Sequence, residues 1–118
     1  MAGEMVHFEM IVKDADAAQA FWSGLFGWEF GAPMEGMDYR MARIDDASGA
    51  AIAGMDEGKA HPNVYLSTDD IDASLAKVRE LGGHAEDKMP VPSFGWFAAC
   101  KDDQGMEFHL WQADSSAA

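Results

Sequence analysis

The sequence has few basic residues, a single cysteine and no long apolar run. Eight Lys and Arg stand against 21 Asp and Glu, which gives a formal net charge of −13 at pH 7. Nucleic acids and anionic membrane surfaces bind basic patches, so this charge argues against both as partners. Cys100 is the only cysteine, which excludes an internal disulfide and fits a reducing compartment. No stretch approaches the roughly 18 apolar residues of a membrane span, and the first residues do not resemble a signal peptide, so we expect a cytoplasmic protein.

The chain of 118 residues is long enough for one domain with a sizeable core, spanning residues 1–118. Apolar alternation predicts strands, and Asp14 and Gly27 bracket one of two amphipathic helices. The predicted strands are 5–12, 28–30, 39–44, 50–55, 63–68, 84–89, 94–101 and 106–112, and the predicted helices are 17–26 and 71–81. Residues 90–93 are predicted to form a loop, and residues 113–118 a frayed tail.

The last two strands form a hairpin around the turn at residues 102–105, and its second strand separates two kinds of side chain. Met106, Phe108 and Leu110 fall on one face, which indicates core. Glu107, His109 and Trp111 fall on the other face. This second face places a carboxylate, an imidazole and an indole side by side, and we therefore look for chemistry there.

The two halves of the chain repeat at a fixed offset. His7 and Asn63 are 56 residues apart (63 − 7). The same offset relates helix caps, packing positions and strand residues: Asp14 to Asp70, Asp16 to Asp72, Ala17 to Ala73, Leu25 to Leu81, Gly27 to Gly83, Ile52 to Phe108 and Ala53 to His109. The repeat predicts an α+β fold of two paired β-α-β-β-β modules, at about residues 5–56 and 62–112. One such module cannot bury both faces of its sheet, so we expect a curved mixed sheet whose helix-free faces line a cavity.

These features resemble the vicinal oxygen chelate superfamily, which includes glyoxalases, bleomycin-resistance proteins and extradiol dioxygenases. The residues that carry the resemblance lie between Met5 and Gln112: 7–9, 21–28, 69–73, 81–83, 95–97, 101–105 and 108–112. The resemblance implies the glyoxalase/bleomycin-resistance-like fold. It does not select a reaction, because this fold hosts isomerases, dioxygenases, thiol transferases and pure binding proteins.

The resemblance also implies positions for metal ligands, on the first and last strands of each module. These positions hold His7, Ala53, Asn63 and His109 in this sequence. His7 matches the usual histidine, His109 replaces the usual glutamate, and Ala53 cannot bind a metal. Two histidines with one carboxylate suit a divalent metal such as Zn, Ni or Fe. The other reading is that His7 and His109 are polar groups lining the cavity without a metal.

Three further predictions concern acid–base chemistry, ligand binding and ligand stacking. Glu9 and Glu107 are candidate general bases, because a carboxylate beside aromatic rings is partly desolvated. Asn63 and Tyr65 share the cavity-facing side of their strand and are candidate ligand-binding residues. Trp96 and Trp111 are candidates for stacking on a planar ligand.

Together these residues predict a glyoxalase-like protein that acts on a small molecule. If it is an enzyme, we expect metal-assisted isomerase or lyase chemistry on an oxygen-rich or carbonyl substrate. The alternative is a non-catalytic protein that binds a drug or metabolite, as bleomycin-resistance proteins do, with the acidic charge favouring cations. The resemblance further implies a homodimer.

Overall fold

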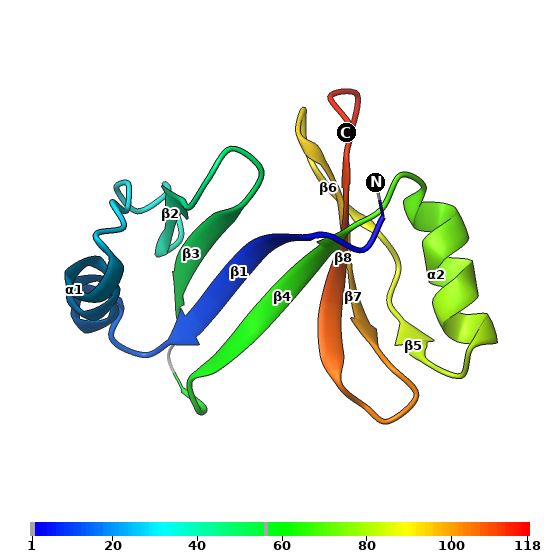
Figure 1. The fold of residues 1–118 in the computed structure, drawn as a ribbon, viewed down its shortest axis with the longest axis horizontal. Helices are drawn as coiled ribbons and strands as arrows, with labels where there is room; N and C mark the ends of the chain where they lie inside the picture. The colour runs from blue at the N-terminus through cyan, green and yellow to red at the C-terminus, as the bar shows by residue number, and fades with distance from the viewer. Residues whose placement is uncertain (1, 56) are drawn as a thin grey trace. The chain divides into compact units, whose positions relative to one another are not determined.

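The computed structural model describes residues 2–55 and 57–118 (Figure 1). Met1 and Asp56, where the predicted first module ends, lie outside the described residues. The chain divides into two compact units. The first unit is Val6–Asn63, and the second unit combines the residues up to Met5 with Val64–Ala118.

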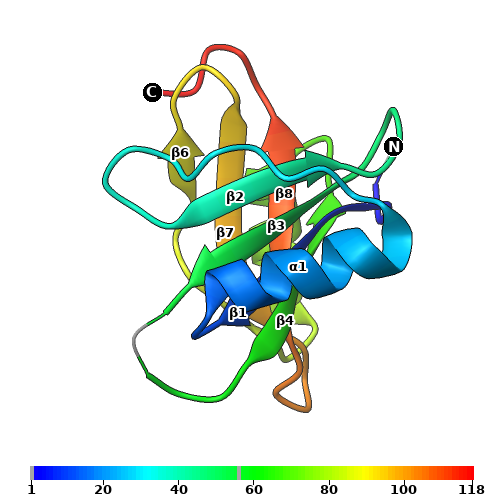
Figure 2. The same ribbon diagram turned by 90° about the vertical axis from the view of Figure 1, so that its left-hand side faces the viewer.

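The first unit contains β1 (Met5–Val12, from its second residue), α1 (Ala15–Phe26), β2 (Tyr39–Arg43) and β3 (Gly49–Gly54). The central strand is β3, which pairs with β1 in parallel and with β2 antiparallel. Figure 2 shows α1 lying across one face of these strands. The helix begins where Asp14 accepts a hydrogen bond from the Ala17 amide, and it ends at Gly27, whose φ of 74° favours glycine.

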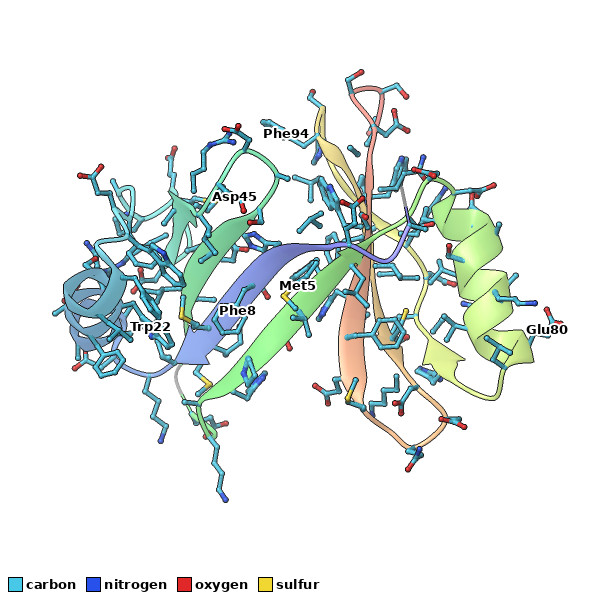
Figure 3. All side chains as sticks on the ribbon, viewed as in Figure 1. Met5, Phe8, Trp22, Asp45, Glu80 and Phe94 are labelled. Atoms are coloured by element: carbon cyan, nitrogen blue, oxygen red, sulfur yellow. The ribbon has the colours of Figure 1, made fainter. Side chains whose placement is uncertain are left out.

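Under α1, the core of the first unit is built from aliphatic residues and stacked indoles. Met10, Ala15, Ala50 and Ile52 are buried there. The rings of Trp22 and Trp28 stack 5.8 Å apart, and the Phe8 ring meets Trp22 edge-on at 6.3 Å, between β1 and α1 (Figure 3). The two large indoles fill the space below the helix. Phe21 and Leu25 on the same helix are therefore left 62% and 56% exposed.

The second unit repeats this plan with two additional short strands. Its elements are β4 (His61–Ser67, from Val64 onward), α2 (Ile71–Glu80), β5 (His84–Ala85), β6 (Met89–Val91), β7 (Gly95–Lys101) and β8 (Glu107–Ala113). The central strand is β8, which pairs with β4 in parallel and with β7 antiparallel. α2 packs against β5, β7 and β8 (Figure 1), with Ile71 and Leu75 buried against Ala98, Cys100 and Leu110.

The predicted repeat is present, but its offset changes along the chain. The first strand and the helix keep the offset of 56, since α1 begins at Ala15 and α2 at Ile71 (71 − 15). In the two hairpins, β2–β3 and β7–β8, the strand register gives an offset of 58 residues. The pair Arg43↔Gly49 of the first unit corresponds to the pair Lys101↔Glu107 of the second unit (101 − 43 and 107 − 49). Ile52 therefore corresponds to Leu110, and the predicted pairs of Ile52 with Phe108 and Ala53 with His109 are wrong by two residues.

Three local predictions differ from the structure. Residues 28–30 form no strand, because the Trp28 and Phe30 rings pack below α1 in an irregular segment. Residues 84–89 were expected to be one strand, but β5 and β6 are separate, and β6 extends into the predicted loop. The tail is not frayed: the Ala117 carbonyl accepts a hydrogen bond from the Ser93 amide, and Ala117 is buried. Within the described part of the chain, neither helix has the length and apolar character needed to cross a membrane.

Candidate functional site

The face of the first unit opposite α1 has a floor of small residues between two walls of larger ones. Alternation along the three strands places these side chains. The floor is Gly49, Ala51 and Ala53 on β3, and the walls are His7 and Glu9 on β1 and Tyr39, Met41 and Arg43 on β2. His7 pairs with Gly49, which pairs with Arg43, so these three residues form one row across the sheet.

A chain of hydrogen bonds joins the two walls. The Tyr39 hydroxyl donates to Oε2 of Glu9 at 2.6 Å, and Nε2 of His7 lies 2.8 Å from the same hydroxyl. Nδ2 of Asn63 donates to the other carboxylate oxygen of Glu9 at 3.3 Å. Glu9 is only 8% exposed. Three of the predicted site residues, His7, Glu9 and Asn63, are thus brought together, and a tyrosine that we did not predict connects His7 to Glu9.

The direction of these bonds assigns the proton on His7. An ionised carboxylate can only accept, so the Tyr39 hydroxyl uses its single proton on Glu9. The hydroxyl oxygen can then only accept from His7, which places the imidazole proton on Nε2. Nδ1 of the neutral ring consequently carries the lone pair. This nitrogen lies beside Gly49, 3.6 Å from the position that a Cβ atom would take there.

The surroundings of His7 keep the imidazole neutral. Burial lowers the pKa of His7 below its usual value, and the negative charge of Glu9 raises it by a smaller amount. At neutral pH the ring is therefore uncharged. Glu9 is placed to stabilise the imidazolium that forms when His7 accepts a proton.

A pocket of about 450 Å³ adjoins His7. Its lining comes from β1, from β2 and from the turn that leads into β3: Val6, His7, Met41, Ala42, Arg43, Asp46, Ala47, Ser48 and Gly49. Such a volume is within the range of small-molecule sites. A ligand in this pocket would contact His7 directly. Glu9 does not line the pocket and is connected to His7 by the hydrogen bonds of Tyr39.

The side chains around His7 do not fit a metal centre built within this unit. Among the described residues, no three His, Cys, Asp or Glu side chains gather closely enough to hold a metal ion. The Tyr39 hydroxyl occupies the position between Nε2 of His7 and Oε2 of Glu9 that a shared metal would need. The predicted pairing of His7 with His109 in one metal site stays a prediction, because these residues belong to different units.

The corresponding face of the second unit carries aromatic rings. The register makes Tyr65 the counterpart of Glu9 and His109 the counterpart of Ala51. The Tyr65 and His109 rings stack at 4.5 Å, and Phe97 lies 6.5 Å from His109. The Trp111 indole also belongs to this face, and it lies against Gly95. Tyr65, His109 and Trp111, three of the predicted site residues, are therefore neighbours.

The remaining predicted residues lie elsewhere. Trp96 belongs to the α2-covered face, where it packs against the core, donates to Asp114 at 3.1 Å and lies under Lys88. Trp96 is half-buried in these contacts, and its role in ligand stacking stays a prediction. Glu107 is exposed at the start of β8, opposite Lys101, beside a smaller pocket of about 200 Å³ that His109 also lines.

Sequence reasoning missed Tyr39 and Arg43. The available signal was the period-two alternation of Tyr39, Met41 and Arg43 in a predicted strand, which places all three on one face.

Comparison with known proteins agrees with this architecture. Residues 5–111 match the family model described as "Glyoxalase-like domain". The chain belongs to this family. The predicted membership of the vicinal oxygen chelate superfamily is thereby confirmed.

Curated relatives of this glyoxalase-like domain are known from mycobacteria. "Putative glyoxylase CFP32" of Mycobacterium tuberculosis is 33% identical over 119 residues, which cover 90% of this chain and 44% of the relative. The Mycobacterium bovis protein of the same name matches equally. The chain thus spans less than half the length of the curated relatives that it matches.

Solved structures show the same fold. Streptomyces coelicolor methylmalonyl-CoA epimerase in complex with 2-nitronate-propionyl-CoA superposes with a TM-score of 0.76 at 17% identity, covering 100% of this chain and 99% of the other. Methylmalonyl-CoA epimerase from Mycobacterium tuberculosis gives 0.74 at 14% identity, with coverage of 95% and 88%. Hypothetical protein BH1468 from Bacillus halodurans gives 0.75 at 12% identity, with 98% of each chain covered. At these identities the likeness establishes the fold alone, and it confirms the predicted α+β class.

Proposed function

We propose that the protein is a glyoxalase-like isomerase or lyase. In this proposal it binds a small carbonyl compound in the pocket beside His7 and transfers a proton at the carbon next to the carbonyl group. The observation that carries the proposal is the chain from Glu9 through Tyr39 to His7, which leaves a lone pair on Nδ1 next to the pocket. A neutral imidazole oriented by a buried carboxylate is a common arrangement for a general base.

The proton moves in two steps. Nδ1 of His7 accepts the proton from the carbon, and the electrons of the C–H bond pass to the carbonyl oxygen and form an enolate. Through Tyr39, Glu9 stabilises the positive charge that appears on the ring. Return of the proton to another position or face of the enolate gives an isomer or epimer, whereas loss of a leaving group from the enolate gives a lyase reaction. Glu9 thus acts as the orienting residue rather than as the base expected from the sequence, because its oxygens already accept from Tyr39 and Asn63.

Enolate formation can be measured without knowing the natural substrate. In D₂O, the protons next to the carbonyl of hydroxyacetone or pyruvate should exchange for deuterium faster with the protein than with buffer, as followed by proton NMR. Tyr39→Phe keeps the ring but removes both hydrogen bonds. Because His7 itself remains, the exchange should slow by about tenfold, which is less than the roughly 100-fold minimum expected for loss of a positioned base. Circular dichroism should show an unchanged fold. Exchange no faster than in buffer for either probe would reject the proposed chemistry.

A non-catalytic binding protein is the second candidate, and the second unit favours it. Tyr65, Phe97 and His109 form a half-buried aromatic group that suits a planar ligand, and the charge of −13 suits a cationic one. A planar cation such as proflavine would then raise the melting temperature, with a stabilisation of about 2.7 kcal/mol at a ligand concentration of 100 Kd. Such stabilisation in a protein without exchange activity would favour the binder over the enzyme.

We further propose a cytoplasmic homodimer, with the exposed apolar side of α1 as the contact. Phe21, Leu25 and Phe26 are each more than half exposed on this helix, and a second copy would cover them.

The double substitution Phe21→Ser/Leu25→Ser should weaken the proposed dimer by at least about tenfold, because it removes apolar area from its contact. Sedimentation equilibrium measures the change. Leu81→Ser is the matched control, since Leu81 is 67% exposed in the second unit and lies outside the proposed contact. A wild-type protein that sediments as a monomer would contradict the proposal.

A further inference from the structure

Arg43 is placed to select the substrate of the pocket beside His7. It is the only cationic residue among those that line this pocket in the described part of the chain. In a protein with a net charge of −13, an anionic ligand needs such a local positive charge to bind. The guanidinium group also offers a planar set of donors that matches a carboxylate.

The row His7, Gly49 and Arg43 sets the dimensions of the site. Neighbouring strands lie about 4.8 Å apart, so the backbones of His7 and Arg43 are separated by about 10 Å across β3. Gly49 between them has no side chain and leaves the space above β3 open. A Cβ atom at this position would lie 3.1 Å from the Ala42 carbonyl oxygen and 3.6 Å from Nδ1 of His7. The gap therefore suits a compact molecule with one end at His7 and the other at Arg43.

The turn after β2 holds the Arg43 guanidinium through main-chain carbonyls, and the charge of Arg43 also contributes to lowering the pKa of Asp45. Oδ1 of Asp45 accepts hydrogen bonds from the Ala47 amide and from the amide and hydroxyl of Ser48. These bonds lower the pKa of Asp45 and keep its carboxylate turned toward the turn itself. Nη1 of Arg43 donates to the main-chain carbonyls of Asp45 and Asp46, at 3.4 and 3.3 Å. Its remaining donors can serve a ligand, as five N–H groups are available.

We propose that Arg43 binds the carboxylate of a small oxo-monocarboxylate whose carbon next to the carbonyl faces His7. This inference rests on the proposed function and names its substrate class. The carboxylate of Asp46 also lines the pocket and repels a second negative charge, which favours a monocarboxylate over a dicarboxylate. The acid–base residue, His7, thus comes from β1, and the anion-binding residue, Arg43, comes from β2 on the other side of β3.

Pyruvate and hydroxyacetone test this proposal, because they have similar size and differ in the carboxylate. Binding is followed by changes in the NMR amide signals of Ser48 and Gly49. Pyruvate should bind at least about tenfold more tightly than hydroxyacetone, and Arg43→Gln should remove this preference, since a hydrogen bond to a charged group contributes about that much. Arg79→Gln is the matched control, because it makes the same charge change on α2 and Arg79 does not line the pocket.

Equal binding of the two probes, or a preference that persists in Arg43→Gln, would overturn the inference. These outcomes can be distinguished from failure of the deuterium-exchange test of the proposed proton transfer. Exchange of hydroxyacetone protons without any preference for pyruvate would keep the proposed function and reject the role of Arg43. Binding of pyruvate that depends on Arg43, without exchange of either probe, would support the anion site and reject the proton transfer.

Discussion

Replacing His7 by glutamine is expected to lower the protein-catalysed deuterium exchange of a carbonyl probe by at least about 100-fold, the size typical of a lost general base. The glutamine amide can still donate to the Tyr39 hydroxyl, as Nε2 of His7 does, so the wall of the pocket is retained. The substitution removes only the nitrogen that accepts the proton. Proton NMR in D₂O measures the exchange, and the amide spectrum checks the fold.

The pH dependence supplies an independent readout of His7. The exchange rate should rise with pH through the pKa of His7, which lies below its ordinary value of 6.5, and then level off. His7→Gln should lose this rise. The same shift affects stability: the unfolded chain binds the proton more readily, so the free energy of unfolding falls as pH drops below about 6.5 and stops falling below the lower folded pKa. A wild-type rate that does not change over this range would exclude His7 as the base.

Glu9→Gln separates orientation from proton transfer. The negative charge of Glu9 raises the pKa of His7, so its removal should lower that pKa further and move the rate profile to lower pH. Titration of the His7 ring signal measures the shift. Glu35→Gln is the matched control, because it makes the same charge change at an exposed position of the first unit. If the Glu9→Gln profile coincided with that of the control, Glu9 would not be coupled to His7.

The sequence predicted the repeated architecture because its signals are local. The Asp14 and Asp70 caps act within four residues of chain, and alternation in β1 and β8 needs only the strand itself. The offset of 58 in the hairpin could not be obtained in this way. It arises because the connection before β7 is two residues longer than the one before β2, and only strand pairing reveals which residues then lie opposite each other.

Part of the candidate site could also be predicted from local sequence signals. His7 and Glu9 share one face of one strand, so alternation places them together. Tyr39 and Arg43 reach that site through the pairing of β2 with β3 and of β3 with β1, over more than 30 residues of sequence. The direction of the Tyr39 hydrogen bond, which assigns the proton on His7, depends on side-chain contacts that no sequence pattern encodes.

Two glycine-to-alanine substitutions should change stability in opposite directions. At Gly95 an added Cβ atom would overlap the Gln112 carbonyl oxygen and would lie 2.6 Å from Cζ2 of Trp111. The first of these atoms is backbone, so β7 and β8 must separate locally, and the Trp111 indole must leave its place. The Gln112 side chain also accepts a hydrogen bond from the first amide of α2, Ile71, which links the strand shift to the helix. We expect Gly95→Ala to reduce the free energy of unfolding by about 3 kcal/mol, the upper range for overpacking.

Gly24 is the matched control within α1, where an added Cβ atom would meet nothing within 4 Å. Because alanine has a lower conformational entropy cost than glycine in a helix, Gly24→Ala should stabilise the protein by about 0.5–1 kcal/mol. Urea denaturation measures both changes, and Trp111 fluorescence should change on substitution of Gly95 but not of Gly24. A Gly95→Ala protein as stable as wild type would show that Trp111 does not pack on this strand, and the aromatic face of the second unit would then have to be assigned differently.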